Sequence, residues 1–344
     1  MIIGGCTLNT NNTIRLTAPE IASLWTLYIF DTMSICFFRY ALEHIEDQEI
    51  KSIYQTSLKI SKKHIQEITI FLLKENHPIP LGFTEKDDVN IYSPRLFQDP
   101  FYLNYLYIMT LQGITGYALA VGNSIRADLR EYYITCMNET MELFDQSINL
   151  MLSKGLFTRP PIITPRESIE FVKHQSFLTG WFGDRRPLNA IEIGDISFNM
   201  LKMHLHAALK VGFIQVAQSK EVRQHFQRGL DIANKHIKLF ESVFEEDLLN
   251  SPISWQSMIT NSTSKTFSDK YMMYQIQLSA QISLSYYGSA LSVNARRDLG
   301  AKYLRLMLEL LHFADDGAKI MIKNGWLEQP PLASDRETLK RDNT

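Results

Sequence analysis

The sequence predicts an all-α protein made of two tandem four-helix bundles with ferritin-like topology. The first observation is an internal duplication, because Lys63-His64-Ile65 recurs as Lys235-His236-Ile237 with similar residues around each copy. The second is a helical periodicity of apolar residues within each copy. The third is that helix-capping residues recur at matching places. We expect bundles at 1–161 and 188–344, joined by an apolar connector at 162–187.

Length and composition agree with two soluble domains. The 344 residues suit two hydrophobic cores, and the apolar (45%) and charged (21%) fractions are ordinary. Lys and Arg (35) nearly balance Asp and Glu (37) and are scattered, which argues against a nucleic-acid partner. The sparse cysteines form no CxxC spacing and indicate reduced thiols in a cytoplasmic protein; they are Cys6, Cys36 and Cys136.

Neither a signal peptide nor a membrane span is expected. Residues 1–12 lack the basic and apolar regions of a signal peptide. The apolar stretch at 21–42 resembles a membrane span, but it contains Asp31 and Arg39, and its counterpart in the second copy is more polar. We therefore predict no membrane span.

Each copy opens with a predicted capping box. Thr17 precedes Glu20 by three residues, and Asn189 precedes Glu192 in the same way at an offset of 172. This spacing places a capping side chain and a glutamate at the helix start, so we assign both glutamates a structural role rather than metal ligation. The first helix then runs to about Ile45.

A second helix follows each first helix after a very short link, so the two are expected to be antiparallel neighbours. Its apolar stripe includes one histidine in each copy, His64 and His236. We expect both imidazoles to be buried, because each stands where the stripe calls for an apolar residue.

A proline-rich connection at 77–100 separates the second helix from the third, and inside it the offset between the copies falls from 172 to 170. Asp99 before Pro100 is a predicted N-cap, with the third helix reaching about Ser124. The fourth helix is expected to be capped by Asp128 or Asp298 and to end at Gly155 or Gly325. One long crossover between the second and third helices is the ferritin-like arrangement.

The connector between the copies is too apolar for a free linker. We expect it to pack across the seam between the bundles and to fix their orientation. Its large apolar residues are Ile169, Phe171, Val172, Phe177, Leu178, Trp181 and Phe182.

Several segments resemble one known family over nearly the whole chain. They are Arg15-Leu16-Thr17, the two histidine phrases, the junction from Gly180-Trp181-Phe182-Gly183-Asp184 to Ala190, and Asn324-Gly325-Trp326-Leu327-Glu328-Gln329-Pro330-Pro331. They are similar to the double-length proteins of the domain of unknown function 3231. The resemblance implies a ferritin-like bundle from an endospore-forming bacterium, sometimes labelled spore-coat-like, and it implies no activity and no functional residues.

The candidate site is a polar layer at one depth of each bundle. Counting residues along the helices at the α-helical rise places a His, a Tyr and a Glu at a common level in both copies. The layer of the first copy contains Asp31, His64, Tyr117 and Glu139, and that of the second contains His204, His236, Tyr287 and Glu309. Two interpretations stay open, a hydrogen-bonded network that fixes helix register and a metal site.

The metal hypothesis, with Zn, Fe or Mn as candidate ions, names two donor sets, and the one richer in imidazole should bind a borderline metal such as Zn²⁺ more tightly. That set is His204, His236, Glu309 and His312; the poorer set is Asp31, His64, Glu139 and Glu142. A complete ferroxidase centre is not expected, because only Glu309 and His312 form a Glu-x-x-His pair. His204 and His206 point in different directions on a helix, so we expect only one to face inward.

These observations favour a non-enzymatic structural or binding protein. A spore association, with spore-layer proteins or further copies of the chain as partners, follows from the resemblance alone. The alternatives are a metal-binding protein or metal-dependent oxidoreductase, and a carrier of a small apolar ligand. No phosphate-binding loop, nucleophile elbow or His-Glu-x-x-His motif is present in the sequence.

Overall fold

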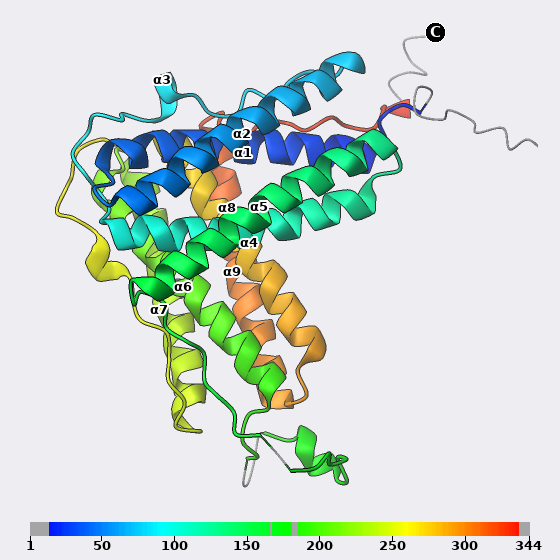
Figure 1. Cartoon of the computed structure of the whole chain (residues 1–344), viewed down its shortest axis with the longest axis vertical. Helices are drawn as coiled ribbons and strands as arrows, with labels where there is room; N and C mark the ends of the chain where they lie inside the picture. The colour runs from blue at the N-terminus through cyan, green and yellow to red at the C-terminus, as the bar shows by residue number, and fades with distance from the viewer. Residues whose placement is uncertain (1–13, 166, 181–184, 337–344) are drawn as a thin grey trace, which may run out of the picture.

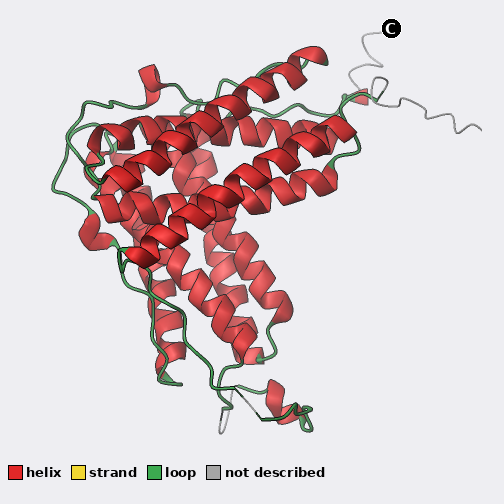
Figure 2. Cartoon of the chain, viewed as in Figure 1, coloured by secondary structure: helices red, strands yellow, loops and turns green. Residues whose placement is uncertain are grey.

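The described part of the chain is built almost entirely of α-helices. The computed structural model describes residues 14–165, 167–180 and 185–336. Within these ranges there is no β-strand, and extended segments pair only at two isolated bridges. Figure 2 shows the helices gathered into two groups that are joined by loops. The all-α prediction is therefore confirmed.

The first group corresponds to the first predicted bundle. Its long helices are α1 (Ala18–His44), α2 (Gln48–Lys74), α4 (Asp99–Asn123) and α5 (Ala127–Ser153). The connection between α2 and α4 is long and contains one short helix, α3 (Glu85–Asp88). The other two links are only a few residues long, so α1 packs beside α2 and α4 beside α5.

The second group repeats this order. Its long helices are α6 (Ala190–Val216), α7 (Lys220–Glu245), α8 (Asp269–Val293) and α9 (Arg297–Lys323). Two short 3-10 helices, η2 (Gln175–Leu178) and η3 (Gln256–Met258), lie in the connector and in the second crossover. In Figure 1 the first bundle runs across the view while the second descends steeply from it. The tandem arrangement of two four-helix units is confirmed.

Both capping boxes form as the sequence predicts. The backbone N–H and the hydroxyl of Thr17 donate to the Glu20 carboxylate at 2.8 and 2.7 Å. Asn189 N–H donates to Glu192 at 3.0 Å, and Glu192 N–H donates back to Asn189 Oδ1 at 2.9 Å. The same carboxylates accept from backbone amides between the third and fourth helices, at Ile125, Arg126 and Arg296. Each glutamate therefore joins two ends of its bundle and needs no metal to explain it.

The predicted N-cap of the third helix in the first copy is displaced by one residue. The third helix of the first copy is preceded by Gln98, and Asp99 is its first helical residue. The Asp99 carboxylate instead accepts from the N–H groups of Glu46 and Asp47 at 3.1 and 2.7 Å, so it holds the link between α1 and α2. An acidic side chain here satisfies orphan amides of a neighbouring turn rather than those of its own helix.

The fourth helices show the same displacement. Their N-caps are Arg126 and Arg296, while Asp128 and Asp298 lie in the first turn and bind those arginines at 2.7 and 2.8 Å. Their C-terminal ends follow the prediction. Gly155 and Gly325 have φ of +65° and +66°, the left-handed conformation that favours glycine after a helix.

The two crossovers exchange hydrogen bonds and are related by a pseudo-two-fold axis. Asn90 N–H donates to the Thr266 carbonyl at 2.7 Å, and Thr260 N–H donates to the Leu96 carbonyl at 2.9 Å. At the offset of 170, Asn90 matches Thr260 and Leu96 matches Thr266, so these bonds are equivalent. The bridges Val89 with Phe267 and Phe97 with Ile259 form a second equivalent pair. Such reciprocal pairing is the signature of an isologous interface.

The seam between the bundles is apolar and aromatic. Phe97 and Phe267 are equivalent residues and are fully buried, and the ring centroid of each lies 6.1 Å from that of Phe37. Tyr105 and Gln275 are also equivalent, and the amide of Gln275 donates to the Tyr105 hydroxyl at 2.6 Å. Residues of both copies consequently belong to one hydrophobic core.

The connector does not occupy this seam, so the expectation that it packs there is wrong. Ile162, Ile169 and Phe171 are 88%, 91% and 86% exposed. The later part, from η2 onward, lies near the start of α9, where Gly180 approaches the Asp298 side chain too closely to admit a Cβ. Trp181 and Phe182 lie outside the described residues. Crossover residues such as Phe97 and Phe267 pack in the seam instead.

One described helix, α1, is long and apolar enough to cross a membrane by length and composition. Just over half of its most apolar window (56%) is buried inside the protein, and Asp31 on it is 3% exposed. Its apolar character is that of a core helix packed against α2 and α4.

Candidate functional site: a histidine layer in each bundle

The first bundle holds a buried histidine between three other helices. His64 on α2 is 1% exposed. Its Nε2 lies 3.1 Å from Glu139 Oε2 on α5, and its Nδ1 lies 2.9 Å from the Tyr117 hydroxyl on α4. Asp31 Oδ2 on α1 lies 3.6 Å from Nδ1, which is longer than a hydrogen bond. The structure thus brings together four of the residues expected at one level.

The second bundle repeats three members of this layer. His236 on α7 is fully buried, with Nε2 3.0 Å from Glu309 Oε2 on α9 and Nδ1 3.1 Å from the Tyr287 hydroxyl on α8. The hydroxyl and carboxylate fix the ring at both nitrogens, so the helices that carry them are held in one register. Both bundles therefore share a His, Tyr and Glu unit.

A lysine on the solvent-facing side of each unit binds the glutamate of that unit. Lys63 Nζ donates to Glu139 at 2.6 Å, and Lys235 Nζ donates to Glu309 at 2.8 and 3.0 Å. Both lysines directly precede the histidines, so the repeated Lys-His pair supplies two donors to one carboxylate. The sequence shows the repeated lysines, but only the structure shows what they bind.

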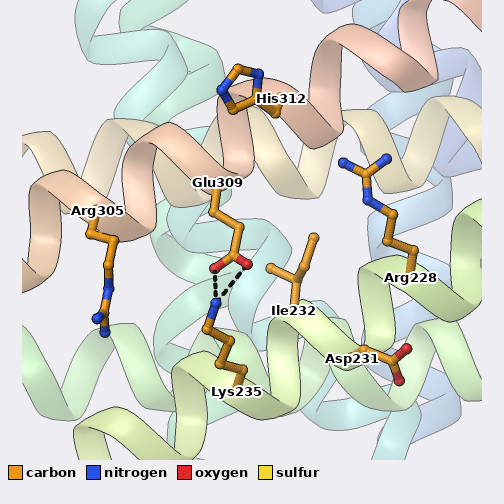
Figure 3. Close-up of a pocket in the computed structure, with 7 residues that line it drawn as sticks. All are labelled: Arg228, Asp231, Ile232, Lys235, Arg305, Glu309 and His312. Carbon is orange, nitrogen blue, oxygen red and sulfur yellow. Dashed lines mark hydrogen bonds and ion pairs between the residues drawn. The ribbon is translucent and has the colours of Figure 1, made fainter.

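Figure 3 shows the outer side of the second unit, a hollow of about 600 Å³ between α7 and α9. The Glu309 carboxylate points to Lys235, while His312 lies further along α9 and is not directed at that pair. His312 is exposed, as is Glu142 on α5. Neither side chain takes part in the buried units.

The remaining member of the richer donor set is buried but isolated. His204 on α6 is 4% exposed, and neither of its ring nitrogens has a hydrogen-bond partner among the described residues. His206 is 2% exposed as well, so the expectation that only one of the two faces inward is wrong. Helix α6 packs against α7, α8 and α4, and its buried surface extends around much of its circumference.

The two buried histidines differ in protonation although their units look alike. Burial disfavours the charge on both rings. Beside His64 the Asp31 carboxylate, together with the Cys136 side chain, outweighs burial and raises the pKa to about 10. Burial lowers the pKa of His236 to about 4 despite its contact with Glu309. The position that corresponds to Asp31 is Met203, and the one that corresponds to Cys136 is Leu306, so both groups that raise the pKa of His64 are missing beside His236.

Metal ligation gains little geometric support. Among the described residues there is no group of three or more His, Cys, Asp or Glu side chains that could hold a metal ion. In the second copy only His236 and Glu309 of the four proposed donors are shown in contact. A transition-metal centre needs at least three protein ligands in a fixed geometry, so this assignment stays a hypothesis.

Two buried lysines on α6 were not expected from the sequence. Lys202 is 1% exposed, its Nζ has no hydrogen-bond partner among the described residues, and it lies 3.3 Å from the centre of the Tyr286 ring. Lys210 is 5% exposed and donates only to the His206 carbonyl, at 3.4 Å. Burial lowers the pKa of Lys202 to about 6 and that of Lys210 to about 7. The corresponding residues of the first copy are Phe30 and Phe38.

Comparison with known proteins places the chain in a family without assigning it a reaction. One solved structure, described as "a putative spore coat protein" from Bacillus halodurans C-125, is 17% identical with a TM-score of 0.41, and the match covers 44% of this chain and 98% of that one. No curated protein sequence matches the chain. A family model described as "Protein of unknown function (DUF3231)" matches residues 6–169 and again 176–339. With both of its halves matched in this way, the chain belongs to that family and contains its characteristic domain twice.

Proposed function

We propose that the protein is a non-enzymatic structural or binding protein whose two bundles act as one rigid unit. The observation that carries this proposal is the reciprocal exchange of the crossovers, which merges the cores of both copies. The histidine units support it, because their polar atoms hydrogen-bond to one another and to a neighbouring lysine. A group whose hydrogen bonds are satisfied internally stabilises the fold rather than awaiting a substrate.

A role in the sporulating cell is the finer part of the proposal. It rests on the resemblance of the chain to a family found in endospore-forming bacteria. A binding protein there would present an outer surface to other layer proteins or to further copies of itself. Exposed apolar residues of the connector, such as Ile169 and Phe171, are available for such contacts.

The test of the proposal is to follow a tagged chain in its native host through sporulation. We expect the protein to accumulate during sporulation and to fractionate with the spore. Equal abundance in growing cells that form no spores, together with absence from purified spores, would contradict the spore role. A variant with Ile169→Ser and Phe171→Ser tests whether the connector makes the contact, since it should leave the melting temperature unchanged and release the protein from the spore.

The second candidate is metal binding at the second histidine unit, favoured by the contact of His236 with Glu309 at 3.0 Å. Metal analysis of protein purified without chelator distinguishes the candidates. Stoichiometric iron, manganese or zinc that is lost in the His236→Ala protein would establish this candidate. A metal-free sample whose melting is unchanged by added metal supports the structural proposal.

An apolar-ligand carrier is less well supported. The cavities beside the histidine unit of the first bundle and beside His206 have volumes of about 50 and 10 Å³. Pockets for small organic ligands usually measure several hundred cubic ångströms. A ligand of that size would need to displace core side chains.

A further inference from the structure

The fourth helix of each bundle exposes a row of large apolar side chains. Of the twelve large apolar residues that are exposed on the eight long helices, seven lie on α5 and α9. Six of these seven occupy matching positions at the offset of 170 and are 41% to 64% exposed: Ile134, Met141 and Leu152 on α5, and Leu304, Leu311 and Ile322 on α9. Single exposed apolar residues are ordinary on a protein surface, but the recurrence of all three positions in both copies is not explained by scatter.

The spacing places each set of three on one side of its helix. The second residue follows the first by seven positions and the third follows it by eighteen. At the α-helical repeat these steps return to within about 20° of the starting direction. Helices pack against one another along apolar rows of this kind. We call the two rows the α5 stripe and the α9 stripe. Within the molecule, α5 packs against α4 and α2, and α9 against α8 and α7, with their other sides.

The two helices differ in charge. Helix α5 has five acidic residues and one basic residue, a net charge of −4. Helix α9 has four acidic and five basic residues, a net charge of +1 with histidine neutral. Opposite net charges on two surfaces that share an apolar stripe favour contact between the unlike helices over contact between two copies of the same helix.

The charge difference is concentrated beside the stripes. Glu131 and Glu142 are exposed on one flank of the α5 stripe. At the same positions α9 has Ala301 and His312, and on this flank it adds an exposed Arg305. When two helices pack antiparallel along such stripes, the same flank of each helix lies on the same side of the pair, so the glutamates of α5 meet Arg305 and His312 of α9. Two α5 stripes would instead bring glutamates together.

From these observations we propose that the chain associates with further copies of itself, with the α5 stripe of one molecule packed antiparallel against the α9 stripe of the next. Such a contact joins two different surfaces, so each bound molecule still presents one free stripe and the association continues head to tail. The stripes are narrow, which places the contact among small, weak interfaces that need a high local concentration of protein. This proposal rests on the structural role proposed above and names its partner.

The first test is sedimentation velocity of the full-length chain from about 1 µM to about 1 mM, the range of dissociation constants of weak contacts. We expect the average mass to rise with concentration. Replacing Met141→Ser and Leu311→Ser together should weaken the association by about tenfold or more and leave the melting temperature unchanged, because both residues are exposed. The control is Leu119→Ser, at an exposed position of α4 outside both stripes. A chain that stays monomeric throughout, or equal weakening by the control, would overturn the proposal.

Charge reversal tests which helices meet. Arg305→Glu with His312→Glu makes the α9 flank acidic, so it should repel the glutamates of α5 and abolish the association. Adding Glu131→Lys and Glu142→Lys to the same chain reverses the other flank as well and should restore the association. Loss without restoration, in a protein whose melting temperature is unchanged, would contradict the pairing of these flanks.

Cross-linking identifies the contact directly. Two chains are prepared with Cys6→Ser, one carrying Met141→Cys and the other Leu311→Cys, and a short bismaleimide is added; the remaining thiols, Cys36 and Cys136, are buried. The mixture should yield more cross-linked dimer than either chain alone. Equal yield from the Met141→Cys chain alone would overturn the assignment to unlike helices. A monomeric chain that is found in spores would contradict only this contact, whereas an associating chain that is absent from spores would contradict only the spore role.

Discussion

At the scale of single residues, the two histidine units show how neighbouring side chains set the charge of a buried ring. His64 and His236 have the same tyrosine and glutamate partners at nearly the same distances. Asp31 lies beside His64 and helps to raise its pKa. Burial lowers the pKa of His236, where Met203 occupies the position that corresponds to Asp31. At neutral pH the first imidazole is therefore charged and the second is neutral.

The charge of His64 should depend on Asp31. In the Asp31→Asn protein we expect the His64 pKa to fall well below its parent value of about 10, because burial then acts with less opposition. Titration of the histidine Cε1–H resonances by NMR measures this, with His236 as the internal control that should not move. A His64 pKa that stays high in the variant would mean that other neighbours, such as the Cys136 side chain, hold the charge.

At the scale of elements, α6 differs most from its counterpart. The helix packs against α7, α8 and α4 and buries Lys202, His204, His206 and Lys210, whereas α1 has aromatic residues at the positions of both lysines. Burial lowers the pKa of each lysine, so protons bind the unfolded chain more readily than the folded one. The two buried lysines therefore lower the free energy of unfolding, and this loss grows as the pH falls from 10.5, the pKa of the lysines in the unfolded chain, towards 7.

Replacing Lys210 should stabilise the protein. A Lys210→Met side chain fills similar space without a charge to desolvate, and we expect the free energy of unfolding at pH 7 to rise by about 1–3 kcal/mol. Urea unfolding at several pH values measures it, and the gain should shrink towards pH 10. Lys238→Met, at an exposed lysine on α7, is the control and should change little. A destabilised Lys210→Met protein would show that the amine has a favourable role in the fold.

At the scale of the whole molecule, the copies should respond differently to acid. Burial lowers the pKa values of His204, His225 and His236, all in the second copy, to about 4. Their contribution to stability is complete above pH 6.5, the unfolded value, and is lost as the pH falls towards 4. The raised pKa of His64 acts in the other direction, because its contribution is present below pH 6.5 and is lost as the pH rises towards 10.

Acidification should therefore loosen the second bundle before the first. Hydrogen exchange followed by mass spectrometry between pH 6.5 and pH 4, corrected for intrinsic exchange rates, should show protection lost first in α7 and α9. His225→Phe should delay that loss. Simultaneous loss in α2 and α5 would indicate that the shared core, and not histidine protonation, controls acid stability.

The reciprocal seam should make the copies energetically inseparable. Phe97→Ala and Phe267→Ala remove equivalent buried rings, and each should lower the free energy of unfolding by about 3–5 kcal/mol. Calorimetry should show one transition for each variant, with calorimetric and van't Hoff enthalpies equal. Two separated transitions would show that each bundle folds alone. Leu119→Ala, at an exposed position on α4, serves as the control.

Much of this fold was predictable because each local signal occurs twice. The capping boxes at Thr17 and Asn189 and the C-terminal glycines Gly155 and Gly325 act within a turn or two of chain, so sequence spacing is enough to identify them. The contact of each histidine with a tyrosine and a glutamate also followed from counting along helices. Metal ligation by these residues is untested and remains a prediction.

What the sequence did not reveal depends on contacts between the copies. Lys202 and His206 are buried because α6 packs against several neighbouring helices, including α4 of the first bundle. The periodicity of apolar residues within one helix cannot predict contacts with a second bundle. The expectation that the connector packs across the seam is wrong for the same reason. Its apolar residues suggested burial, but crossover residues pack in the seam, and their pairing involves residues about 170 positions apart.

The pseudo-two-fold pairing of the crossovers has a consequence for how the unit survives dilution. In an assembly of separate chains, an interface of this kind falls apart once the protein concentration drops below its dissociation constant. Here both halves of the interface are carried on one polypeptide, which gives them a high effective concentration towards each other, on the order of millimolar for a short flexible link. The chain is in effect a covalent dimer, so its melting temperature should be the same at nanomolar and micromolar protein, wherever in the cell it works.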